Sequence, residues 1–74
     1  MNFNPTSLGA LVRERRKALQ LGQADLAELS GVSLHTLLNL ETGKGNPTLR
    51  VSLRVLEVLG LELTVQPRKT DGAV

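Results

Sequence analysis

Apolar residues recur along most of the chain at spacings of three, four and seven, which predicts a series of short amphipathic helices. The first helix should begin near Thr6 or Ser7, because Pro5 is excluded from a helix interior and a hydroxyl can cap the first turn. It should end before Gln20-Leu21-Gly22. Its expected buried stripe is Leu8, Leu11, Val12 and Leu19.

Two further helices are predicted over residues 23–29 and 34–41, separated by Gly31-Val32-Ser33. Small Ala27 would let two helix backbones approach, Gly31 would take the tight turn, and Leu37 would fill the crossing. Ser33 is expected to cap the second of these helices and Gly43 to end it. The residues expected to point inward are Leu26, Ala27, Leu29, Leu37 and Leu40.

A fourth helix is predicted over residues 48–59, and it has two apolar stripes. One stripe is Leu49, Leu53 and Leu56, and the other is Val51, Val55 and Val58. A helix with two apolar faces is buried on both sides. Because a chain of 74 residues has no second layer to cover the valine stripe, we expect a second copy of the chain to cover it.

The periodicity changes after Gly60, where apolar and polar residues alternate through Leu61, Leu63 and Val65. This pattern predicts a strand over about 61–66. A single strand leaves its backbone groups without partners, so we expect it to pair with the same strand of a second copy. The last residues, 68–74, are predicted to be a mobile tail.

Length and composition limit how such a chain is stabilised. The chain has no cysteine and a single histidine, which argues against a disulfide or a zinc site. The core of a domain this small supplies little stability, so such domains usually also need a disulfide, a metal ion or oligomerisation. With the first two disfavoured, oligomerisation is the expected source of the extra stability. No apolar run is long enough to span a membrane and the start does not resemble a signal peptide, so a cytoplasmic protein with no membrane partner is expected.

The basic residues are clustered although the net charge is only +2. The cluster consists of Arg13, Arg15, Arg16 and Lys17. On charge alone a solvated helix face is the simpler interpretation, and long-range attraction of nucleic acid is the alternative. The acidic residues are scattered and no nucleophile can be paired with a base, so neither an enzyme nor a bound cofactor is predicted.

The segment from Gln23 to Lys44, QADLAELSGVSLHTLLNLETGK, resembles the Cro/cI (Xre)-type helix-turn-helix family. The resemblance implies an all-α fold, a lambda-repressor-like bundle of four or five helices with a C-terminal β-strand that pairs across a homodimer. The DNA-binding domain would then cover residues 1–67. The ending LELTV, from Leu61 to Val65, is most like that of HipB-type antitoxins.

The resemblance also implies partners. One is double-stranded operator DNA in the promoter of the protein's own operon, bound to repress transcription. The other is a HipA-like serine/threonine kinase toxin. Two alternatives stay open, namely a stand-alone phage-type or operon repressor without a toxin, and a protein-binding adaptor built on the same scaffold.

Individual positions carry over from the family's motif to this chain. The positions that would read DNA bases are Leu34, His35, Thr36 and Asn39. Those that would contact phosphates are Gln23, Ser33, Lys44, Asn46 and Thr48. The valine stripe and the predicted strand of this chain, and not the motif, indicate a dimer interface of Val51, Val55, Val58, Leu61, Leu63 and Val65. The resemblance further implies a structural ion pair between Arg16 and Glu41.

The chemistry of these side chains suits such roles, although each has a simpler alternative. The Asn39 amide can pair with adenine, and His35 can donate to guanine or phosphate, while an exposed polar helix face is the alternative for both. Leu34 can offer only an apolar contact, for example to a thymine methyl group. For Leu38, partial burial against the fourth helix or a partner is favoured over contact with DNA.

Overall fold

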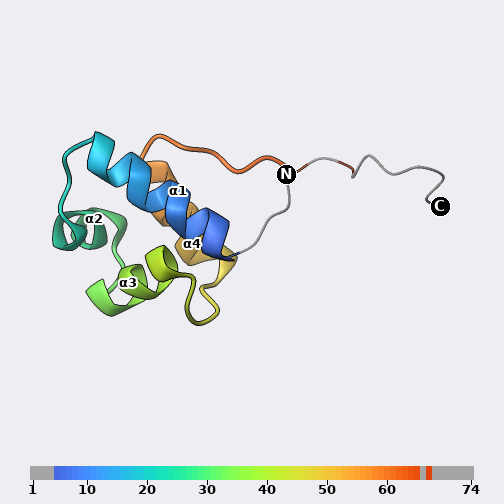
Figure 1. Ribbon diagram of the computed structural model, residues 1–74, viewed down its shortest axis with the longest axis horizontal. Coiled ribbons are helices and arrows are strands. Elements are labelled where there is room, and N and C mark those ends of the chain that lie inside the picture. The colour runs from blue at the N-terminus through green and yellow to red at the C-terminus, as the bar shows by residue number, and fades with distance from the viewer. Residues whose placement is uncertain (1–4, 66, 68–74) are drawn as a thin grey trace.

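The computed structural model describes residues 5–65 and residue 67, and the described part of the chain is helical without strands. Figure 1 shows the helices and their connections. The four helices are α1 (Pro5–Ala18), α2 (Gln23–Ser30), α3 (Leu34–Thr42) and α4 (Leu49–Val58). The all-α architecture predicted from the sequence is therefore confirmed.

Local signals place the helix ends close to their predicted positions. The Ser33 hydroxyl accepts the Thr36 N–H at 3.0 Å, and the Thr48 hydroxyl accepts the Val51 N–H at 3.1 Å. Gly43 ends α3 in the left-handed conformation with φ 75°. The exception is α1, which begins at Pro5 itself. A proline is favoured at the first helical position, because the N–H that it lacks would have no partner in the helix.

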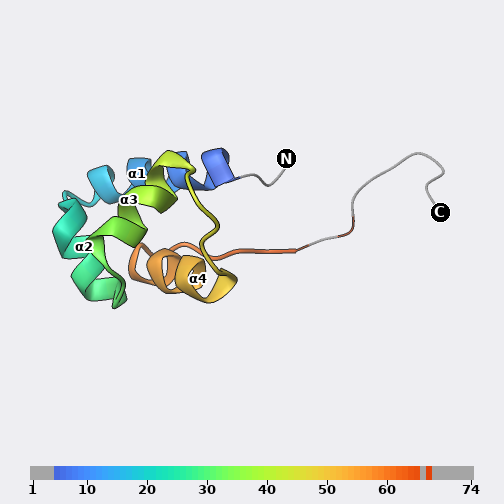
Figure 2. The same ribbon diagram turned by 90° about the horizontal axis from the view of Figure 1, so that it is seen from below.

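The helices enclose one core, with α3 packed against α1 and α2, and α4 packed against α2. Figure 2 shows α1 and α4 on opposite sides of the bundle. The core residues are Leu8, Val12, Leu26, Ala27, Leu37, Leu40, Val55, Leu56 and Leu59. Ala27 and Leu37 are both buried, as the predicted helix crossing requires.

Several leucines that were predicted to be buried are exposed instead. These are Leu11, Leu19, Leu29, Leu49 and Leu53. On α4 the buried face runs through Ser52, Val55, Leu56 and Leu59, at spacings of three, four and seven, and so lies between the two predicted stripes. Val55 is fully buried in the chain's own core, which makes its predicted place in a dimer interface wrong.

The backbones of α1 and α3 approach each other very closely at Gly9, which sequence analysis missed. A Cβ atom at Gly9 would lie 2.6 Å from the carbonyl oxygen of Glu41 and closer still to that of Leu40. Only a residue without a side chain lets the α1 backbone pass the end of α3 at this distance. Gly9 therefore sets how α3 is held against α1.

The segment after α4 does not form the predicted strand within this chain. Residues 61–65 have no regular secondary structure, and both views show the segment leading away from the bundle (Figures 1 and 2). A strand needs a partner for its backbone groups, and the single chain offers none among its described residues. Residue 66 and the predicted tail, 68–74, lie outside the described residues.

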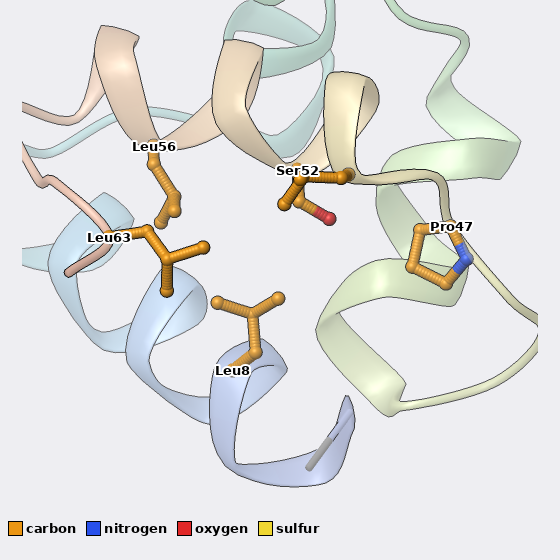
Figure 3. A pocket seen from close by; sticks show the side chains of 6 residues that line it. Leu8, Pro47, Ser52, Leu56 and Leu63 are labelled. Carbon is orange, nitrogen blue, oxygen red and sulfur yellow. The ribbon is translucent and has the colours of Figure 1, made fainter. Parts of the chain in front are cut away.

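The start of this segment nevertheless packs on the bundle. Leu61 is partly buried against the core. Leu63 lies beside Leu8 and Leu56 at the edge of an apolar hollow of about 210 Å³, as Figure 3 shows. The other residues lining this hollow are Pro47, Leu49 and Ser52.

Replacing Ser30 with alanine is expected to raise the free energy of unfolding by about 1 kcal/mol. The Ser30 hydroxyl is buried and has no hydrogen-bond partner, so its removal relieves an uncompensated loss of hydration. Urea denaturation at fixed protein concentration measures the change. Ser33→Ala is the matched control and should lower stability by about 1 kcal/mol, because that hydroxyl caps α3. Equal losses from both variants would contradict the expectation.

Candidate nucleic-acid interface

One face of α3 points away from the core and carries polar side chains. Leu37, Leu40 and Glu41 form the buried face of this helix. Successive residues are rotated by about 100° around a helix axis, so the side chains opposite that face come from His35 and Asn39. His35 is exposed and Asn39 is half-buried. The short helix thus presents a polar edge that its own domain leaves uncovered.

His35 and Asn39 are in direct contact on this edge. Nδ2 of Asn39 lies 3.2 Å from Nε2 of His35, one helical turn away. With Nε2 as the acceptor, Asn39 donates one amide hydrogen to it. The second hydrogen and the amide oxygen then form the donor and acceptor pair that complements the major-groove edge of adenine. Two predicted base-reading side chains are therefore brought together.

The hydroxyl groups at the start of α3 are engaged with each other. Ser33 accepts the Thr36 N–H and donates to the Thr36 hydroxyl at 2.8 Å. The Ser33 side chain therefore acts as a helix cap. Its hydroxyl hydrogen is already donated to Thr36 and is not available for the phosphate contact predicted at this position. The hydroxyl hydrogen of Thr36 can still be donated outward.

A groove of about 260 Å³ lies between α3 and the loop that follows it. The residues lining it are Thr36, Asn39, Lys44, Gly45, Asn46, Pro47, Thr48 and Val51. This set includes two positions predicted to read bases and three predicted to contact phosphates. The structure therefore brings these five predicted positions, which are up to twelve residues apart in the sequence, to one concave surface.

A buried ion pair fixes α3 against the first two helices. Arg16 donates from Nε to Glu41 Oε2 at 2.7 Å and from Nη2 to Oε1 at 3.1 Å, so the expected pair of Arg16 and Glu41 is present. Arg16 also donates to the carbonyl of Leu21 at 2.9 Å. The two charged side chains are 9% and 2% exposed. The pair thus joins α1, the loop before α2 and α3.

Gln23 belongs to the same network, which the sequence did not reveal. Its Nε2 donates to Glu41 Oε1 at 3.2 Å. This contact occupies one amide hydrogen and holds the side chain at the start of α2. The phosphate contact predicted for Gln23 would have to use the other amide hydrogen.

The basic cluster on α1 divides into structural and exposed residues. Arg16 is buried, and Arg15 Nε donates to the Leu59 carbonyl at the end of α4 at 2.9 Å. Arg13, Arg15 and Lys17 are exposed. The charges of these three remain available for long-range attraction of an anionic partner, whereas that of Arg16 is neutralised by Glu41.

The described residues lack both a membrane span and a cluster of metal ligands. None of the helices there has the length and apolar character needed to cross a membrane. Nor does the same part of the chain contain a group of three or more His, Cys, Asp or Glu side chains able to hold a metal ion.

Comparison with known proteins gives consistent matches across this region. The family described as "Helix-turn-helix domain" matches residues 7–67. An uncharacterised HTH-type transcriptional regulator from Sinorhizobium fredii is 39% identical over 61 residues, which is 82% of this chain and 80% of the relative. One from Methanothermobacter thermautotrophicus is 44% identical over 52 residues, covering 70% and 75% of the two chains. The ImmF control region 10 kDa protein of Bacillus phage phi105 is 33% identical, covering 78% and 64%.

Solved structures with the same fold were also found. A chain of the HipA-HipB-O2-O3 complex superimposes with a TM-score of 0.80 and 28% identity, covering 93% of this chain and 97% of its own length. A chain of the HipB-O4 20mer complex gives the same TM-score, identity and coverage.

Proposed function

The chain belongs to the helix-turn-helix family of transcriptional regulators, and we propose that it is a sequence-specific DNA-binding repressor in which α3 reads the major groove. The observation that carries this proposal is the uncovered polar edge of α3, where His35 and Asn39 are in contact and Asn39 also lines the groove next to the following loop. An α-helix fits the major groove, where each base pair presents its own pattern of donors and acceptors.

In this proposal, contacts to phosphates supply most of the affinity, and contacts to bases determine which DNA sequence is bound. Lys44, Asn46 and Thr48 would contact phosphates from the rim of the groove, and exposed Arg13 and Lys17 would attract DNA at longer range. Contacts of this kind orient a protein on DNA but carry no base information. Asn39 and its neighbours on α3 would supply that information. Bound at a promoter, the protein would block polymerase.

A salt titration tests DNA binding itself. The full-length protein is titrated onto a duplex carrying the promoter of its own gene and onto a random duplex, at several salt concentrations. The logarithm of the binding constant should fall linearly with the logarithm of salt concentration, by about 0.9 for each phosphate neutralised. A flat dependence with negligible affinity for both duplexes would favour the protein-binding adaptor instead.

The Asn39→Ala variant is expected to lose about 1–3 kcal/mol of discrimination between two duplexes. One is the preferred site, and the other has the adenine that Asn39 would contact replaced by another base. The fold should survive, because Asn39 contacts His35 on the surface and not the core. Fluorescence anisotropy with the two duplexes measures the ratio of affinities. Lys44→Ala is the control, since it should weaken both affinities alike. An unchanged ratio for Asn39→Ala would remove this residue from the base-reading set.

The proposed functional unit is a homodimer that places two α3 helices on one face of the duplex. The exposed apolar side chains Leu49, Leu53 and Leu63 would contact a second copy, and two of them, Leu49 and Leu63, line the same apolar hollow. The segment 61–65, extended and without a strand partner, would pair with its counterpart. The operator would then be a near-palindrome with half-site centres about 34–36 Å apart, or a multiple of this.

Truncation after Gly60 is expected to weaken dimerisation, because it removes the segment that would pair between copies. Sedimentation velocity over a range of concentrations should show dissociation at a concentration where the full chain stays dimeric. The helices themselves should remain folded by circular dichroism, apart from the loss of Leu61 packing. A truncated protein that dimerises as tightly as the full chain would exclude a role for this segment.

The similarity to a chain of the HipA-HipB-O2-O3 complex supports a further part of the proposal, in which the protein acts as an antitoxin. It would bind a HipA-like kinase toxin and repress its own operon from the cytoplasm. Purification of the tagged full-length protein from its native host, followed by mass spectrometry, tests this partner. Recovery without any kinase would favour the stand-alone repressor, which the similarity to the phage control region protein also supports.

A further inference from the structure

A second stripe of α3 lies beside the His35–Asn39 edge, and it is apolar. Leu34 and Leu38 are one turn apart, so their side chains lie about 40° from each other around the helix axis. Leu34 is 44% exposed, and Leu38 is half-buried although the core contact of this helix is made by Leu37 and Leu40. The helix therefore presents an apolar ledge, formed by Leu34 and Leu38, next to its polar edge.

We propose that this ledge receives the C5-methyl group of a thymine in the base pair next to the one read by Asn39. The inference rests on the proposed DNA-binding function and makes it more specific. Among the groups that base pairs expose in the major groove, the thymine methyl is the apolar one. An apolar ledge continuous with a polar reading edge therefore matches a thymine placed beside an adenine.

The neighbouring side chains support an apolar ligand for the ledge. The Thr42 hydroxyl lies on the same side of α3, and it donates to the carbonyl oxygen of Leu38 at 2.9 Å. Its hydrogen is thereby used within the helix, so this side chain does not compete with the ledge by donating to a base. Leu38 and His35 are three residues apart and lie about 60° from each other around the helix axis, so the ledge borders the polar edge.

Deoxyuridine tests the proposal directly, because it keeps every hydrogen-bonding group of thymidine and lacks only the C5-methyl. A preferred site is first selected by the full-length protein from a random duplex library made with thymidine. Each thymidine of that site is then replaced singly by deoxyuridine. At one position in each half-site the affinity should fall about fourfold, the effect of one buried methyl group.

Variants show whether the ledge is responsible. Leu38→Ala and Leu34→Ala should each bring the ratio of the affinities for the thymidine and deoxyuridine duplexes toward one. Two variants are used so that a folding defect in one of them does not decide the result. Leu19→Ala removes a similarly exposed leucine from the turn after α1 and should keep the ratio of the two affinities unchanged. Asn39→Ala should also keep the methyl preference while losing the preference for adenine.

The possible failures are distinct. Equal affinity for thymidine and deoxyuridine at all positions of a selected site would overturn the ledge proposal and leave DNA binding intact. A preserved ratio in both leucine variants would likewise overturn it. The wild type could also bind both duplexes equally while Leu34→Ala loses a protein that co-purifies with the wild type. That result would assign the ledge to a protein partner. Failure to select any site would overturn the DNA-binding function itself.

Discussion

Replacing Arg16 with methionine is expected to lower the free energy of unfolding by about 3–5 kcal/mol, because it leaves a buried carboxylate without its cation. Glu41 is 2% exposed and receives two hydrogen bonds from Arg16. The remaining side-chain donor to Glu41, the amide of Gln23, is neutral and cannot replace the lost positive charge. A domain of this size has only about 3–5 kcal/mol in its core, so the variant should be largely unfolded.

Urea denaturation followed by circular dichroism measures this loss. Arg13→Met is the matched control, since it removes the same group from an exposed position on the same helix and should change stability by less than about 0.5 kcal/mol. The double variant Arg16→Met with Glu41→Leu should recover much of the stability, because a buried ion pair can be replaced by apolar residues of similar volume. A single Arg16 variant as stable as the Arg13 control would contradict the structural role of the pair.

Replacing Gly9 with alanine is expected to lower stability by about 1–3 kcal/mol, although the same change in an open helix would raise it by about 1 kcal/mol. The added Cβ would lie 2.6 Å from the Glu41 carbonyl oxygen, and that atom belongs to a helix backbone that cannot move aside alone. The end of α3 must therefore shift away from α1. DNA affinity should fall together with stability, because α3 also carries the edge that we propose to read DNA.

Thermal denaturation compares this variant with Ala10→Leu. That control adds more volume to an exposed position of the same helix and should leave stability within about 0.5 kcal/mol of the wild type. A Gly9→Ala protein that melts above the wild type would show that α1 and α3 are not held at the distance described.

Local backbone features were readable from the sequence because they depend on near neighbours. A hydroxyl at Ser33 or Thr48 caps the helix that begins with the next residue, and Gly43 ends α3 in a left-handed conformation. These rules act over one turn of helix. The helix-turn-helix region was therefore located to within a residue or two from the pattern alone.

The orientation of each helix was harder to predict, since it depends on contacts between distant segments. On α4 both predicted stripes are apolar, and the core lies between them with Ser52 near its centre. A buried serine gives no periodic signal. Gly9 did offer a signal of another kind. A glycine inside a helix costs about 1 kcal/mol relative to alanine, so its presence there indicates that another backbone approaches closely.

The candidate site was partly accessible from sequence. The contact between His35 and Asn39 follows from a spacing of four residues on a helix. The pair of Arg16 and Glu41 spans 25 residues and came from family resemblance, not from spacing. The place of Gln23 in that network needed the structure, since it depends on how α2 starts against the end of α3.

An NMR titration tests most directly whether the uncovered edge of α3 contacts DNA. Isotope-labelled full-length protein is titrated with the duplex selected from the random library. The largest shift changes should fall on His35, Asn39 and the loop of Lys44 and Asn46, with little change at Leu53 on α4. Changes concentrated around Leu53, with the signals of α3 unmoved, would contradict the account.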